Sequence, residues 1–70
     1  MKVLLTTDRC TPALTRTIVC DTMRYFDSKR KLLMYDKKGH LCAYAMIDEW
    51  AEVSYICKGK QHYIKRRTEK

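Results

Sequence analysis

The stretch from Lys31 to Ile47 constrains the fold most, because it predicts a β-hairpin that is apolar on both faces. Lys37-Lys38-Gly39 is a three-residue connection that ends in glycine, which adopts the left-handed backbone conformation without steric cost. Such a loop fixes which residues face each other across the two strands. The predicted pairs are Asp36–His40, Tyr35–Leu41, Met34–Cys42, Leu33–Ala43 and Leu32–Tyr44.

Side chains along a strand point alternately to opposite faces, so this register divides the hairpin into two apolar sets. One face carries Leu33, Tyr35, Leu41 and Ala43. The other face carries Leu32, Met34, Cys42, Tyr44 and Met46. A short chain has material for one covering layer, so we expect one face to be buried only in a dimer or complex. Aromatic residues and methionine are enriched in interface cores, which favours Leu32, Met34, Tyr44 and Met46 as the partner-binding face.

A helix is predicted over residues 12–27, ahead of the hairpin. Thr11 is a good N-cap and Pro12 suits the first helical position. At helical spacing, Leu14, Ile18 and Tyr25 fall on one half of the helix surface and the charged residues on the other. The β-branched residues in this segment favour a strand instead, and they are Thr15, Thr17, Ile18, Val19 and Thr22. We give more weight to the separation of the two faces, because packing supplies most helix stability in proteins.

Three further strands are predicted. Lys2 to Thr7 reads as a central strand, and Trp50 to Cys57 and Gln61 to Arg66 form a second hairpin around a Lys58-Gly59 turn. The cross-strand pairs predicted for this hairpin are Tyr55–His62, Val53–Ile64, Glu52–Lys65 and Ser54–Tyr63. The fold class is therefore α+β, with one helix on a mostly antiparallel sheet of four to five strands. Residues 1–66 form one small domain, and residues 67–70 form a basic tail.

The formal net charge of +7 is concentrated in two segments. Residues 29–38 have a net charge of +4 and residues 58–70 a net charge of +5. Cations with an interleaved aromatic ring are typical of proteins that bind nucleic acid or another acidic surface. The candidate basic contact residues are Lys29, Arg30, Lys31, Lys58, Lys60, Lys65, Arg66 and Arg67.

Catalytic and metal-binding motifs are not found in the sequence. There is no Gly-rich phosphate loop and no Gly-x-Ser-x-Gly elbow. The four cysteines, Cys10, Cys20, Cys42 and Cys57, lie at least ten positions apart, whereas structural zinc sites pair ligands about two to four residues apart. We expect no enzymatic activity, no cofactor and no metal, and we expect four reduced thiols.

The N-terminus lacks the features of a signal peptide, and no apolar run approaches the roughly 20 residues of a membrane span. We therefore expect a cytoplasmic protein that does not enter a membrane. The leading hypothesis is a small non-enzymatic binding protein that occupies a surface of a nucleic-acid-handling complex, in the manner of small phage-encoded inhibitors. The alternative is a direct nucleic-acid-binding regulator, dimeric in form.

Overall fold

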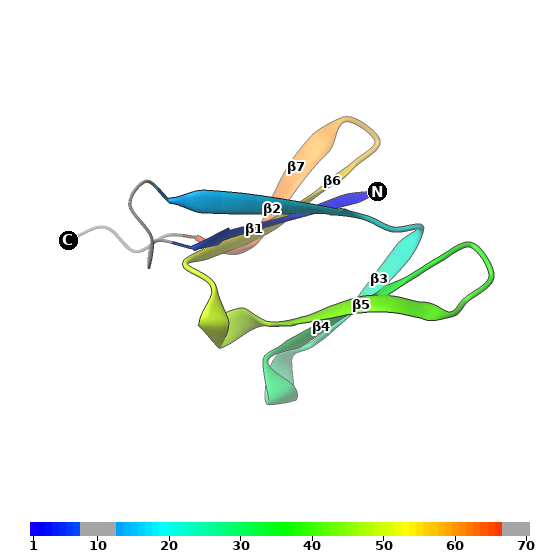
Figure 1. Ribbon diagram of the computed structural model, residues 1–70, viewed down its shortest axis with the longest axis horizontal. Helices are drawn as coiled ribbons and strands as arrows, with labels where there is room; N and C mark the ends of the chain where they lie inside the picture. Colours follow the sequence, from blue (N-terminus) through cyan, green and yellow to red (C-terminus); the bar gives the residue numbers. More distant parts are fainter. Residues whose placement is uncertain (8–12, 67–70) are drawn as a thin grey trace.

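The computed structural model describes residues 1–7 and 13–66, and in these ranges the chain is all-β, with seven antiparallel strands and two 3-10 turns (Figure 1). The strands are β1 (Lys2–Thr7), β2 (Leu14–Val19), β3 (Thr22–Phe26), β4 (Lys31–Tyr35), β5 (Leu41–Met46), β6 (Glu52–Cys57) and β7 (Lys60–Lys65). The 3-10 turns are η1 (Asp27–Lys29) and η2 (Ile47–Glu49). The described residues contain no helix long and apolar enough to cross a membrane.

The predicted helix over residues 12–27 is wrong, and with it the α+β class. Residues 14–19 and 22–26 form the strands β2 and β3 instead. The β-branched residues prefer the extended backbone, and in β3 a period of two also separates the faces. Met23 and Tyr25 pack on the core, whereas Arg24 is exposed. The predicted helix start at Thr11 and Pro12 lies outside the described residues.

The strands form two sheets that are joined by a short connection between β2 and β3. The four-stranded sheet has the order β2-β1-β6-β7, and the three-stranded sheet has the order β3-β4-β5. Cys20 and Asp21 alone separate β2 from β3, so the chain passes directly from one sheet to the other (Figure 1). The Cys20 N–H donates to the Met1 carbonyl and the Asp21 N–H to the Tyr35 carbonyl, both at 2.9 Å. This junction ties the two sheets together.

The core lies between the sheets. Val3, Leu5 and Val53 are buried on the four-stranded sheet, and Leu32, Met34 and Ala45 are buried on the three-stranded sheet. Cys20 and Ile47 complete the core from the connections. Each sheet therefore covers one face of the other, which is the role predicted for the helix.

The first hairpin turns as predicted and then departs from the predicted register. Gly39 has a φ of +81°, and the Asp36 N–H donates to the His40 carbonyl at 2.9 Å. The Asp36–His40 and Tyr35–Leu41 pairings are thus confirmed. A β-bulge at Cys42 then shifts the register by one residue. The observed pairs are Met34–Ala43, Leu33–Tyr44 and Leu32–Ala45, so the predicted Met34–Cys42, Leu33–Ala43 and Leu32–Tyr44 pairs are wrong.

The second hairpin shows the same behaviour. Lys58 and Gly59 both have positive φ, 53° and 78°, which confirms the predicted two-residue turn. The Tyr55–His62 and Ser54–Tyr63 pairs are confirmed. A bulge then places Val53 opposite Lys65, so the predicted Val53–Ile64 and Glu52–Lys65 pairs are wrong. β1 has its predicted bounds and its predicted central position in the sheet.

Candidate functional site

Apolar side chains cover the face of the three-stranded sheet that points away from the core. Leu32, Met34 and Ala45 are buried, so their neighbours along β4 and β5 point outward. The register places these outward residues in rows across the sheet. We call this surface the outer face and define it by Phe26, Leu33, Tyr35, Leu41, Tyr44 and Met46.

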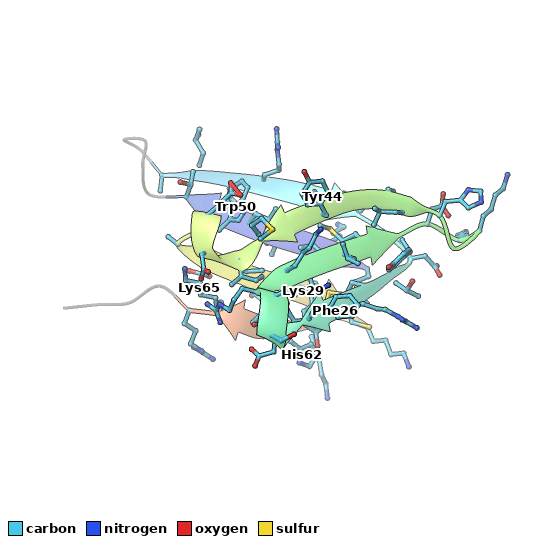
Figure 2. The ribbon with its side chains drawn as sticks, turned by 90° about the horizontal axis from the view of Figure 1, so that it is seen from below. Phe26, Lys29, Tyr44, Trp50, His62 and Lys65 are labelled. Atoms are coloured by element: carbon cyan, nitrogen blue, oxygen red, sulfur yellow. The ribbon has the colours of Figure 1, made fainter. Side chains whose placement is uncertain are left out.

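Three side chains of the outer face are more than a third exposed. The exposed fraction is 38% for Phe26, 54% for Leu41 and 61% for Tyr44. Figure 2 looks onto this side of the molecule, and both Phe26 and Tyr44 project from the front sheet. The core is already closed between the two sheets, so these rings do not serve it. Contiguous exposed apolar surface of this kind marks interaction sites.

Cations surround the outer face. The Lys31 Nζ lies 5.1 Å from the centre of the Tyr44 ring, which is a cation–π contact. Arg24 lies in the same cross-strand row as Leu33 and Tyr44. Residues 22–46, which form this sheet and its turns, contain six Lys or Arg and two Asp or Glu, a net charge of +4. A partner for this surface must therefore tolerate this positive charge or supply negative charge.

The carboxylates near this sheet already accept hydrogen bonds from their own chain. The Tyr25 hydroxyl donates to Asp27 Oδ1 at 3.0 Å. Asp36 Oδ1 accepts the backbone N–H groups of Lys38 and His40, each at 2.9 Å. Desolvation of the phenol, followed by this bond to Asp27, raises the pKa of Tyr25. These contacts occupy the acidic groups while Arg24, Lys29 and Lys31 face solvent or a ring.

Arg30 makes contacts within its own chain. It adopts the left-handed conformation with a φ of 51°, and its carbonyl accepts the Ile47 N–H at 2.9 Å. Its guanidinium donates to Asp48 Oδ1 from Nη2 at 3.0 Å and from Nε at 3.1 Å. The hydrogen bond to Asp48 raises the pKa of Arg30 above its already high value. Arg30 thus joins the β3–β4 turn to η2.

The described basic residues do not form one patch. Lys29 ends η1 and Lys31 begins β4, whereas Lys58 and Lys60 lie at the β6–β7 turn, on another side of the molecule (Figure 1). Lys65 lies nearer to Arg30, because its Nζ donates to the Ile47 carbonyl at 3.5 Å and the Ile47 N–H donates to the Arg30 carbonyl. Figure 2 shows Lys29 and Lys65 apart. Arg67 and the rest of the predicted tail lie outside the described residues.

A second group of aromatic and basic side chains surrounds β7. The rings of Tyr55 and His62 are stacked, with centres 5.0 Å apart and planes at 24°. The Arg66 guanidinium carbon lies 4.4 Å from the centre of the Tyr63 ring. These four residues line a shallow hollow that Tyr25 borders from β3. The two pairs combine rings with one cation along the sheet edge formed by β7.

Two of the four predicted partner-binding residues are not on the surface. Leu32 and Met34 are both 0% exposed and belong to the core, because their face of β4 packs against the four-stranded sheet, and the bulge at Cys42 places Ala43 and Ala45 on that face. Tyr44 and Met46 do lie on the outer face, beside Leu33, Tyr35 and Leu41 from the other predicted set. Phe26 was missed because it was assigned to a helix. Alternation within residues 22–26 would have placed it outward.

Within residues 1–7 and 13–66, no three His, Cys, Asp or Glu side chains are grouped as a metal site would need. Cys20, Cys42 and Cys57 are free thiols, and Cys10 lies outside the described residues. Burial, with a smaller effect from Cys42, raises the pKa of Cys20, which lowers its reactivity.

The chain was compared with protein families, with curated proteins and with solved structures, and nothing in the three comparisons matches it significantly.

Proposed function

We propose that this chain is a non-enzymatic binding protein that docks through its outer face on a partner protein. The partner surface would have an apolar centre and a rim of carboxylates. One observation carries the proposal: six apolar side chains lie on a sheet face outside a closed core, among cations. Leu33, Leu41 and Met46 favour a protein partner over nucleic acid, since aliphatic side chains are stabilised by an apolar contact surface, which a charged phosphate backbone does not offer.

The charge of the chain bears on the setting of this partner. A net charge of +7 attracts the chain to concentrated negative charge and speeds encounter with it. We infer that the partner belongs to a nucleic-acid-handling complex, where the small basic chain would act by occupying a surface. In this proposal, Tyr44 is a central contact and Lys31 supplies charge at its edge.

The test is affinity capture with three forms of the full chain: the parent, Tyr44→Asp and Leu14→Asp. Leu14 is 57% exposed and lies on the four-stranded sheet, so it controls for an apolar-to-acidic change elsewhere. A genuine partner is retained by the parent and by Leu14→Asp and lost with Tyr44→Asp. Its binding should also weaken with added salt and with Lys31→Glu. Equal capture by all three forms, or loss with Leu14→Asp alone, would contradict the proposal.

A second candidate function is single-stranded nucleic-acid binding in the hollow beside β7. It is favoured by the Tyr55–His62 stack and the Tyr63–Arg66 pair, because stacking on rings combined with cations suits single strands. Titration of a single-stranded oligonucleotide over a range of salt concentrations tests it. Binding that falls with salt and is lost in Tyr63→Ala, but kept in Tyr44→Asp, would support this function. Absence of binding at low salt would exclude it.

A further inference from the structure

β2 is an edge strand whose second side is open. It pairs with β1 on one side and ends the order of the four-stranded sheet. In Figure 2 its light-blue ribbon runs along the upper border of the molecule. Its side chains are mostly exposed, and Val19 reaches an exposed fraction of 70%. Among the described residues, no strand pairs with this open side.

The register shows which backbone groups face this open side. The Cys20 N–H donates to Met1, within the same register that runs unbroken from Lys2–Val19 to Thr7–Leu14. Hydrogen-bonded pairs alternate along an antiparallel ladder, so residues 14, 16 and 18 direct their N–H and C=O groups toward β1. Thr15, Thr17 and Val19 therefore direct theirs outward. β1 agrees with this assignment, because the Thr6 carbonyl accepts from Ala51 on the β6 side.

The other edge strands carry features that discourage pairing, and β2 does not. A bulge interrupts the pairing of β5 with β4 and of β7 with β6. β7 also carries Lys60 and Lys65, and β3 is only five residues long. Bulges, lysines and short length are the usual protections of an edge. β2 has six residues in unbroken register, one cation and no proline.

We propose that a second copy of this chain pairs antiparallel along β2, with the twofold axis at Thr17. Pairing of two edge strands about a twofold axis keeps each face of the joined sheet continuous. Even-numbered residues must therefore lie opposite even-numbered residues of the second copy, and odd-numbered residues opposite odd-numbered ones. An axis at Thr17 pairs Thr17 with Thr17 of the second copy, Thr15 with Val19, and Arg16 with Ile18. The outward groups then form three hydrogen-bonded pairs with two bonds each.

The dimer would join two four-stranded sheets into one sheet of eight strands. It would cover part of the exposed Val19 side chain against Thr15 of the second copy. The outer face takes no part in it, so this proposal is independent of the proposed function. Two chains of charge +7 repel each other, and added salt should therefore strengthen the dimer by screening.

The position of the axis is tested by disulfide trapping. Thr17→Cys would place two thiols on a pair whose Cα atoms are about 5.5 Å apart, within the range that a disulfide spans. Thr15→Cys is the control, because the axis places its two copies far apart. Mild oxidation should link Thr17→Cys rapidly, while Thr15→Cys and the parent link slowly. Equal rates for the two variants would overturn the proposed register.

The dimer itself is tested by sedimentation of the reduced full chain over a range of concentration and salt. Thr17→Pro removes an outward N–H from each copy, and proline is tolerated on an open edge. The affinity should fall at least about tenfold, through the loss of two hydrogen bonds. Thr17→Lys should also dissociate the dimer, whereas Thr22→Lys, with the same added charge on β3, should not. A parent that stays monomeric at its highest soluble concentration and at high salt would overturn the proposal.

Discussion

Aspartate at Leu32 should unfold the protein, whereas aspartate at Tyr44 should leave it folded. Leu32 is 0% exposed and packs in the core between the sheets. Removing a buried leucine side chain costs about 2–5 kcal/mol, and burying an unpaired polar group adds about 1–3 kcal/mol. A 70-residue domain has a stability of about 4–10 kcal/mol at the usual value per residue. The Leu32→Asp penalty is therefore comparable to the whole stability of the domain.

Tyr44 is 61% exposed, so the same replacement acts mainly on the surface. The variant loses the contact between Lys31 and the ring, worth about 0.5–1 kcal/mol at an exposed site. Other effects of an exposed substitution are usually within about 0.5 kcal/mol. The total loss is about 1 kcal/mol. The midpoint of thermal unfolding should then fall by about 4–8 °C, as expected for a domain of this size.

Circular dichroism during heating, with urea titration at 25 °C, separates the two results. Leu32→Asp should lack a cooperative transition, and Tyr44→Asp should keep one with an unchanged dependence on urea. Leu33→Asp, the next residue along β4, should behave like Tyr44→Asp, because it also belongs to the outer face. The reasoning would be refuted if Leu32→Asp folded with near-parent stability. It would equally be refuted if Tyr44→Asp and Leu33→Asp both unfolded.

Three further predictions concern thiols, pH and turns. Under native conditions an aromatic disulfide reagent should modify the exposed Cys42 well before the buried Cys20, as measured by thiol mapping with mass spectrometry. The reverse order would contradict the described packing. The folded pKa of Cys20 is raised above its ordinary value of 9.0, so its contribution to the unfolding free energy is complete below pH 9 and declines as pH rises through the folded pKa. Urea titrations at several pH values should show that Cys20→Ala flattens this decline. An unchanged dependence of the unfolding free energy on pH would refute the prediction. Lys58 and Gly39 both have positive φ, which glycine adopts at less cost than other residues. In the same urea assay, Lys58→Gly should raise the unfolding free energy by up to about 1 kcal/mol, and Gly39→Ala should lower it by about 1 kcal/mol. Changes of the opposite sign would contradict the turn geometry.

The turns were predictable from the sequence because they depend on local chemistry. Gly39 and Gly59 identified both hairpins, and the pairs nearest each turn are confirmed. The bulges were not predictable, because they depend on how each strand packs against the opposite sheet. A one-residue shift at Cys42 exchanged the predicted faces of β5, which is why Leu32 and Met34 were assigned to the surface.

The helix prediction failed at a particular competition between two patterns. The segment from Leu14 to Phe26 separates apolar from charged residues at helical spacing, and it is also rich in β-branched residues. A helix would need one sheet face to rest on, whereas here a second sheet supplies that cover. Long-range pairing of β2 with β1 and of β3 with β4 decided the outcome, and no local signal carries that information.

The sequence predicted that an apolar face would lie outside the core, but not which residues form it. Apolar residues on both faces of the hairpin showed that one set would be left outside the core. The division into sets required the register, and the addition of Phe26 required a third strand. Concentrated charge likewise predicted basic surfaces. The structure places Lys58 and Lys60 away from Lys31, and Arg30 forms an ion pair with Asp48.

The most direct test of the outer face uses the methyl groups of the four methionines, labelled with carbon-13 and assigned by single Met→Leu variants. Met46 lies on the outer face, whereas Met34 is fully buried in the core. When a partner captured by the parent and lost by Tyr44→Asp is added to saturation, the Met46 resonance should shift or broaden while the Met34 resonance changes little. An unchanged Met46 resonance in the saturated complex would contradict docking through the outer face.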